Sequence, residues 1–143
     1  MCKLGFDIGL KDLKAEELEY CQLAVANWKR LQPVILDGVQ YRLVSPYESN
    51  HMAVNYVSQD CSKGVVFTYD IYPRFQEKLM KLKVRGLDPN KMYKVEEINL
   101  MPTEESELKE HGKVFSGDYL MKVGLDVFGF QPTRSHVIEL TAE

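Results

Sequence analysis

The sequence predicts a mainly β fold, an antiparallel β-sandwich of the Greek-key type preceded by one amphipathic α-helix. Two observations lead to this class. Apolar residues recur with a helical period only between Asp12 and Leu31, whereas the pattern after Gly38 alternates with the period of two typical of strands. The alternating segments follow one another at intervals of about ten to fifteen residues. They are joined by turns rather than by helices, which favours antiparallel pairing.

The leading helix is predicted over residues 12–31, with Asp12 as its N-cap and Pro33 as the residue that stops it. Its apolar stripe follows the i, i+3, i+7, i+10 spacing and consists of Leu18, Cys21, Val25 and Trp28, flanked by Ala24 and Leu31. A stripe of this kind has to be buried. Either the sheet that follows or a neighbour outside this chain covers it.

The strands are predicted from alternation and from β-branched or aromatic runs. They span residues 39–43, 52–57, 65–72, 81–85, 93–98, 127–130 and 136–140. Residues 86–90, Gly-Leu-Asp-Pro-Asn, form a turn. The acidic stretch 103–113 is predicted to be a solvated loop or a short exposed helix. Ser116 is expected to cap one helical turn that Gly124 closes.

Composition limits the possible partners. The chain has 143 residues, a length suited to a single domain, with 45% apolar and 27% charged residues. The net charge of −3 arises from interspersed charges of both signs, so neither nucleic acid nor an anionic membrane is a predicted partner. No apolar run approaches the roughly 20 residues that cross a bilayer.

Cysteine and histidine spacing predicts no metal or cofactor site. Cys2, Cys21 and Cys61 are far apart and form no CxxC pair, which excludes a zinc site of the usual spacing. We expect reduced, inert thiols and, for Cys21, a small buried hydrophobe, as suits a reducing compartment. None of the three histidines, His51, His111 and His136, has ligand spacing to another candidate ligand, so each is interpreted as structural or solvated.

The search for catalytic groups yields no catalytic residue. The sequence contains no phosphate-binding glycine loop, nucleophile elbow or HExxH pair. Glycoside hydrolysis requires two carboxylates that meet in space. Glu48 and Asp70 are the acids nearest the apolar strands, but an acid at a strand end is more often a turn or ion-pair residue.

A dense aromatic run invites comparison with sugar-binding surfaces, because flat rings stack on sugars. It contains Tyr47, Tyr56, Phe67, Tyr69, Tyr72 and Phe75. Alternation places Phe67 and Tyr69 on one face of a strand, which predicts that both lie in the core or in a domain interface.

Six short segments of the chain resemble, in order, the end of family 36 alpha-galactosidases. They are Leu4–Ile8 with the helix end Asn27–Leu31 and the strand Tyr41–Glu48; the strand and turn Leu82–Tyr93, which contain Arg-Gly-Leu-Asp-Pro; and Ser116–Met121 followed by Val123–Leu125. No single segment is decisive, but their order and spacing together are specific, and they cover essentially the whole chain.

The resemblance implies a two-part organisation. Residues 1–33 would be the tail of a (β/α)8 barrel with its final helix, and residues 34–143 would be the C-terminal antiparallel β-sandwich. The parent enzymes are retaining hydrolases of terminal α-galactosides such as melibiose and raffinose, and they often form homo-oligomers. Their two catalytic Asp motifs are missing from this sequence, so no catalytic residue is carried over. Galactosides would reach the protein only through the parent's barrel.

The leading hypothesis is therefore a non-catalytic accessory domain of an alpha-galactosidase, with the missing barrel as its partner. The start of the chain supports it, because Phe6, Ile8 and Leu10 alternate as in an extended segment that packs on a neighbour. The alternative is a free-standing carbohydrate-binding β-sandwich module. A small independent enzyme is the third hypothesis. No targeting segment is recognised, and of the possible compartments the cytoplasm is the expectation.

Overall fold

The computed structural model describes residue 5 and residues 9–143. Cys2, Phe6 and Ile8 lie outside the described residues. The elements, in chain order, are the 3-10 helix Leu10–Asp12, α1 (Ala15–Asp37), β1 (Val39–Val44), β2 (His51–Val57), β3 (Lys63–Asp70), β4 (Met92–Glu97), β5 (Val114–Ser116), α2 (Gly117–Lys122) and β6 (Ser135–Ala142). The predicted class, a mainly β antiparallel fold after one long helix, is confirmed.

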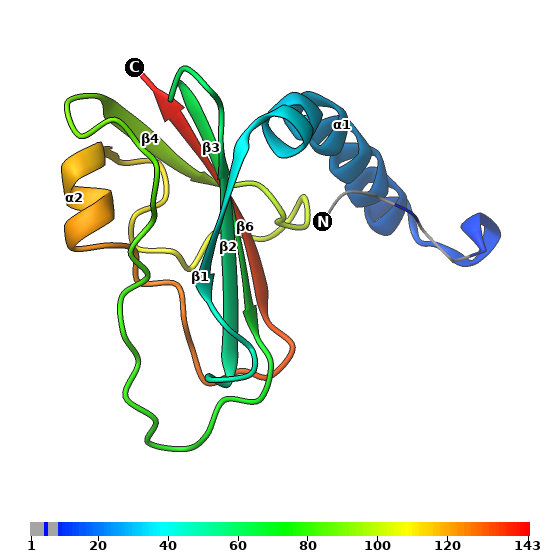
Figure 1. Cartoon of the computed structure of the whole chain (residues 1–143). Helices are drawn as coiled ribbons and strands as arrows, with labels where there is room; N and C mark the ends of the chain where they lie inside the picture. The colour runs from blue at the N-terminus through cyan, green and yellow to red at the C-terminus, as the bar shows by residue number, and fades with distance from the viewer. Residues whose placement is uncertain (1–4, 6–8) are drawn as a thin grey trace.

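The strands form a six-stranded antiparallel sheet in the order β1-β2-β3-β6-β4-β5. In Figure 1 the sheet is seen nearly edge-on, with α1 on one side and α2 with long connecting segments on the other. Because both faces are covered, β2 and β3 are buried along most of their length instead of on alternate residues. The sheet is thus the middle layer of three.

The α2 side holds the larger apolar core. Alternate sheet residues point into it, among them Val66, Val95 and Ile138, which are all fully buried. Opposite them lie Leu82, Val84 and Leu87, Leu120 of α2, and Leu125 and Val127. Leu82 and Leu125 pair through an isolated bridge, with both backbone amides donating to the opposite carbonyl. The predicted strands 81–85 and 127–130 are therefore wrong as strands, although they supply the layer that packs on the sheet.

The acidic stretch 103–113 differs from the prediction in its burial. It is a loop with turns, as expected, but Leu108 and Glu110 are only 5% exposed. Leu108 joins the α2-side core. Because this stretch has no apolar periodicity, its pattern does not indicate which of its residues turn inward.

The predicted cap of the short helix is confirmed. The Ser116 hydroxyl accepts a hydrogen bond from the Tyr119 backbone amide at 3.1 Å, and α2 follows directly. Gly124 ends this segment with φ at +88°, in the left-handed region that glycine adopts without strain.

The long helix differs at both ends from the prediction. It begins at Ala15, where the backbone amide of Lys14 donates to the Glu17 carboxylate at 2.8 Å, and Asp12 lies in the preceding 3-10 helix. It continues through Pro33 to Asp37, so the prediction that Pro33 stops it is wrong. Pro33 and Lys29 are exposed, so water can solvate the Lys29 carbonyl that loses its bond. Burial of Leu31, Val34 and Ile35 on the sheet stabilises this last turn. The predicted domain boundary at residue 33 falls inside α1, and the division itself stays a prediction.

Candidate functional site

A buried histidine–carboxylate pair joins the first residue of β2 to the last residue of β3. His51 and Asp70 face each other across the strands, with His51 Nδ1 2.7 Å from Asp70 Oδ1. The Gly129 backbone amide donates to the other carboxylate oxygen, Oδ2, at 3.0 Å. The His51 ring also packs on Phe128, with ring centroids 4.7 Å apart. Both oxygens of Asp70 thus hold the loops at this end of the sheet together.

This geometry bears on the acids singled out as catalytic candidates. Asp70 is 3% exposed and engaged on both oxygens, whereas Glu48 lies exposed in the turn after β1. The two acids therefore occupy different environments rather than one open cleft, which fits the turn and ion-pair interpretation. The expectation that the chain has no catalytic residue stays a prediction.

Another buried pair lies near the opposite edge of the sheet, where β6 meets β4. His136 Nδ1 is 2.5 Å from Glu97 Oε1, and the Ser106 hydroxyl donates to Glu97 Oε2. The Glu97 backbone amide donates to His111 Nδ1 at 3.0 Å. Burial by itself raises the pKa of Glu97, but the hydrogen bonds from His136 and Ser106 outweigh it and hold the pKa below its ordinary value.

The hydrogen bonds of this second cluster hold separate segments of the chain together and do not form a catalytic arrangement. A nucleophilic serine needs its hydroxyl hydrogen-bonded to a base that is itself oriented by a third group. Here Ser106 donates to the carboxylate, and His136 occupies the opposite oxygen of that carboxylate. His51, His111 and His136 are therefore all engaged in structural hydrogen bonds. Within the described ranges, no group of three or more histidine, cysteine or acidic side chains could hold a metal ion.

The described cysteines are both free thiols of intermediate exposure. Cys61 lies in the β2–β3 turn with φ at +53°, and its carbonyl accepts a hydrogen bond from the Tyr93 hydroxyl at 2.7 Å. Cys21 is on α1 but only half-buried, so the expectation of a buried hydrophobe is wrong for it.

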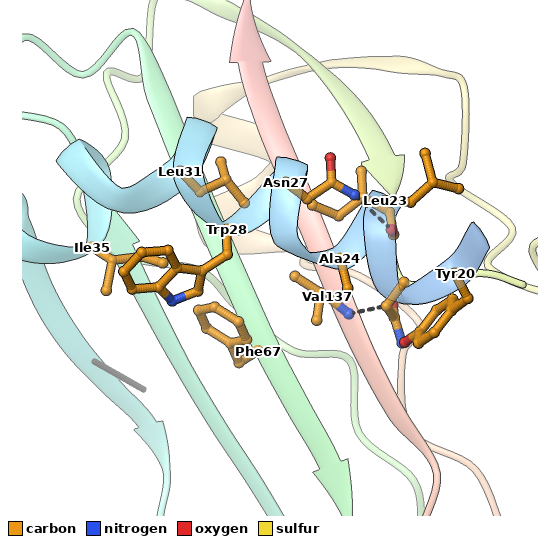
Figure 2. A pocket seen from close by; sticks show the side chains of 11 residues that line it. Tyr20, Leu23, Ala24, Asn27, Trp28, Leu31, Ile35, Phe67 and Val137 are labelled. Atoms are coloured by element: carbon orange, nitrogen blue, oxygen red, sulfur yellow. Dashed lines mark hydrogen bonds between the residues drawn. The ribbon is translucent and has the colours of Figure 1, made fainter. Parts of the chain in front are cut away.

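The face of α1 toward the sheet encloses an apolar pocket of about 180 Å³. Figure 2 shows Trp28 projecting from α1 over Phe67, with Leu31 and Ile35 beside it. The helix is also tied to the sheet by polar contacts, since the Asn27 amide donates to the Ile98 carbonyl at 3.1 Å and Arg30 forms an ion pair with Glu139. The Trp28 indole nitrogen is buried and has no hydrogen-bond partner among the described residues.

The apolar stripe predicted on the helix coincides only in part with the face that packs on the sheet, because Trp28, Ala24 and Leu31 face the sheet and the rest of the stripe does not. Successive residues are about 100° apart around a helix, so Cys21 and Val25 lie roughly 100° away from the buried Leu31. Leu18 and Leu36 lie on the same outer side and are 40% and 52% exposed. The helix thus has two apolar faces. The sheet covers the one that contains Leu31. On the outer side Leu18 and Leu36 are exposed, and Cys21 and Val25 are half-buried.

The aromatic run divides into two environments. Phe67 is buried between the sheet and α1, and Tyr69 packs against the same cluster, so the prediction for this pair is confirmed. Tyr56 is buried there too. Tyr47, Tyr72 and Phe75, by contrast, are 97%, 74% and 92% exposed on loops.

Comparison with known proteins accounts for this architecture. Residues 51–140, more than half of the chain, match the Glycosyl hydrolase family 36 C-terminal domain. The chain belongs to this family. The family 36 match covers β2 through nearly all of β6, so it includes the sheet and both histidine–carboxylate pairs. It confirms the resemblance drawn from the sequence.

The relatives of this family 36 domain are alpha-galactosidases. Alpha-galactosidase 1 of Pediococcus pentosaceus is 30% identical over 121 residues, which cover 85% of this chain and 15% of the relative. Probable alpha-galactosidase G of Aspergillus terreus is 32% identical over 92 residues, or 64% of this chain and 13% of the relative. The chain therefore spans only a small part of the length of these relatives.

A solved structure extends the likeness to the helix. The family 36 alpha-galactosidase AgaB from Geobacillus stearothermophilus superposes with a TM-score of 0.77 at 27% identity. The superposition covers 94% of this chain and 17% of AgaB. Because 94% of the chain cannot be matched by the strands and loops alone, α1 belongs to the shared architecture. Among the described residues no helix combines the length and apolar character that a bilayer crossing requires.

Proposed function

We propose that this chain is the non-catalytic C-terminal accessory domain of an alpha-galactosidase whose full-length form hydrolyses terminal α-galactosides. The observation that carries the proposal is the second apolar face of α1. The sheet already covers one face, yet Leu18 and Leu36 continue an apolar stripe on the outer side. An outer stripe of this kind marks a contact with another folded body.

The partner in this proposal is the catalytic barrel of the same enzyme. The relatives extend far beyond the region that this chain matches, and they carry the name alpha-galactosidase. Solved structures of variants of the Geobacillus stearothermophilus alpha-galactosidase AgaA are complexes with raffinose and with stachyose. Galactosides would be bound in the barrel, and this domain would cover one side of it. Homo-oligomerisation of the full-length enzyme is part of the same proposal.

A chimeric enzyme tests the accessory role. The matching C-terminal region of the Pediococcus pentosaceus enzyme would be replaced by this chain, and hydrolysis of an aryl α-galactoside would be measured. We expect the chimera to be active and the 143-residue chain alone to be inactive. Leu36→Asp should lower the yield of active chimera, because a charge then faces the apolar contact. Val123→Asp, at a similarly exposed apolar residue on the other side of the sheet, is the matched control.

Two results would contradict the accessory role. One is turnover by the isolated chain that disappears in Glu48→Gln or Asp70→Asn. The other is a Leu36→Asp chimera that matches the Val123→Asp chimera in yield and activity, since the outer stripe would then have no partner.

A second candidate function is the carbohydrate-binding module. The exposure of Tyr47, Tyr72 and Phe75 favours it, because rings held in water are available for stacking. Titration of galactose, melibiose and raffinose into the isolated chain, followed by calorimetry, tests it. Saturable heat with any of these sugars supports binding, and its absence with all of them refutes it.

A further inference from the structure

The three most exposed aromatic rings of the run lie on neighbouring loops at one end of the sheet. Tyr47 is in the turn between β1 and β2, and Tyr72 and Phe75 are in the segment that follows β3. Figure 1 shows both loops at the lower end of the sheet, away from α1. The rings therefore lie apart from the helix face proposed to contact the barrel.

Backbone hydrogen bonds join the two loops. The Asn50 carbonyl accepts from the backbone amides of Ile71 and Tyr72 at 2.9 and 3.1 Å. Within the first loop, the Ser45 carbonyl accepts from the Glu48 and Ser49 amides. The position of Tyr72 relative to the β1–β2 turn is thus set by main-chain contacts.

Glu77 fixes the segment that carries Phe75. Both of its carboxylate oxygens lie 3.2 Å from the Asn50 side-chain amide, and one also accepts from the Arg74 backbone amide at 3.1 Å. The Arg74 amide is the main reason that the pKa of Glu77 lies below its ordinary value. Beneath these contacts lies the buried His51–Asp70 pair. The loops that carry the rings are therefore pre-organised, and binding a ligand would cost little ordering entropy.

The surroundings of the rings suit an oligosaccharide. Glu48, Arg74 and Gln76 are exposed next to these rings in the chain, so polar side chains as well as the apolar Ile71 and Met80 are exposed in these loops. A pyranose presents a C–H face that stacks on a ring and hydroxyls that bond to such polar neighbours. Several rings on two loops match several sugar units, and the family to which the chain belongs acts on carbohydrates.

We propose that Tyr47, Tyr72 and Phe75 form a non-catalytic surface that binds an oligosaccharide of three or more units. The proposal rests on the second candidate function, the carbohydrate-binding module, and specifies its binding residues and the minimum length of its ligand.

Calorimetric titration of the 143-residue chain with stachyose, raffinose and galactose tests this surface. We expect the tetrasaccharide to bind more tightly than the trisaccharide and galactose to bind weakest. Tyr72→Ala and Phe75→Ala should each weaken stachyose binding by about tenfold, the usual scale for losing an aromatic anchor. Tyr72→Phe keeps the ring and should retain binding, and Val123→Ala is the control on the opposite side. Because all these side chains are exposed, the melting temperatures should agree.

The outcomes distinguish failure of this surface from failure of the carbohydrate-binding function as a whole. Saturable stachyose binding that Tyr72→Ala and Phe75→Ala leave unchanged would overturn this surface while leaving the carbohydrate module in place. No binding of any sugar would overturn both. A fall in melting temperature or a change in oligomeric mass in Tyr72→Ala would assign the ring to folding or to a protein contact, and would equally refute the proposal.

Discussion

The two faces of the sheet are packed in different ways. On the α2 side, residues such as Leu125 and Ile138 are fully buried, and His51 pairs with Asp70 and His136 with Glu97, although the buried Nε2 of His51 has no hydrogen-bond partner among the described residues. On the α1 side, a smaller cluster leaves a pocket of about 180 Å³, and the buried Trp28 indole nitrogen has no partner among the described residues. The α2 side resembles a finished domain core, whereas the α1 side has room to adjust.

The largest effect should come from removing volume on the α2 side. We expect Leu125→Ala to lower the free energy of unfolding by about 3–5 kcal/mol, because its fully buried side chain would leave a cavity that tight neighbours cannot fill. Leu31→Ala on the α1 side should cost about 2 kcal/mol, since it enlarges a pocket that is already open. Urea unfolding followed by circular dichroism measures both. Equal losses would mean that the two faces are packed alike.

An intermediate effect concerns the paired polar groups. The folded-state pKa of Glu97 is lower than its ordinary value of 4.5. The ionised carboxylate therefore contributes stability above pH 4.5, and this contribution is lost as the pH falls through the lower folded value. Glu97→Gln should lower stability at pH 7 by about 1–3 kcal/mol, because partners such as Ser106 and His136 lose a charged acceptor.

The same substitution should flatten the acid limb of the stability curve. Unfolding free energies measured in urea between pH 3 and pH 7 test this expectation, with Glu96→Gln, at a half-buried acid on the opposite face of the same strand, as the control. If the wild type and Glu97→Gln lose stability in parallel as the pH falls, the assignment of the lowered pKa to this pair is wrong.

The smallest effect should come from filling the α1-side pocket. Ala24 lines the pocket from the helix, so Ala24→Leu adds apolar volume where space exists. We expect a gain of about 0.5–1 kcal/mol, measured as a rise in melting temperature. Ala53→Leu, at a fully packed residue of the α2-side core, should be destabilising by contrast. A loss of stability in Ala24→Leu would show that the pocket is not available to a side chain.

Local sequence patterns were sufficient to predict the strands and caps that depend on neighbouring residues in the chain. Strand alternation placed β1, β2, β3, β4 and β6 within a few residues, and Ser116 and Gly124 marked both ends of the short helix. They also sufficed for the family, because the segments from Leu4 to Leu125, taken together in order, led to the family that the comparison confirms. They placed Phe67 and Tyr69 on the inward face, since alternation on a strand is a property of the backbone.

Tertiary structure decided the features that depend on distant partners. The helix continues through Pro33 because Val34 and Ile35 are buried against the sheet. The residues near Pro33 in the sequence do not indicate that this sheet is there. Residues 81–85 and 127–130 have the alternation of strands, but of the two segments only 81–85 forms a bridge, between Leu82 and Leu125, because a strand needs a partner in register along its whole length. Which apolar face of α1 the sheet covers, and which loops hold Tyr72 and Phe75 in water, follow from the packing of separated segments. The sequence by itself therefore determined most of the elements and the family, and the three-dimensional arrangement determined which surfaces remain available for function.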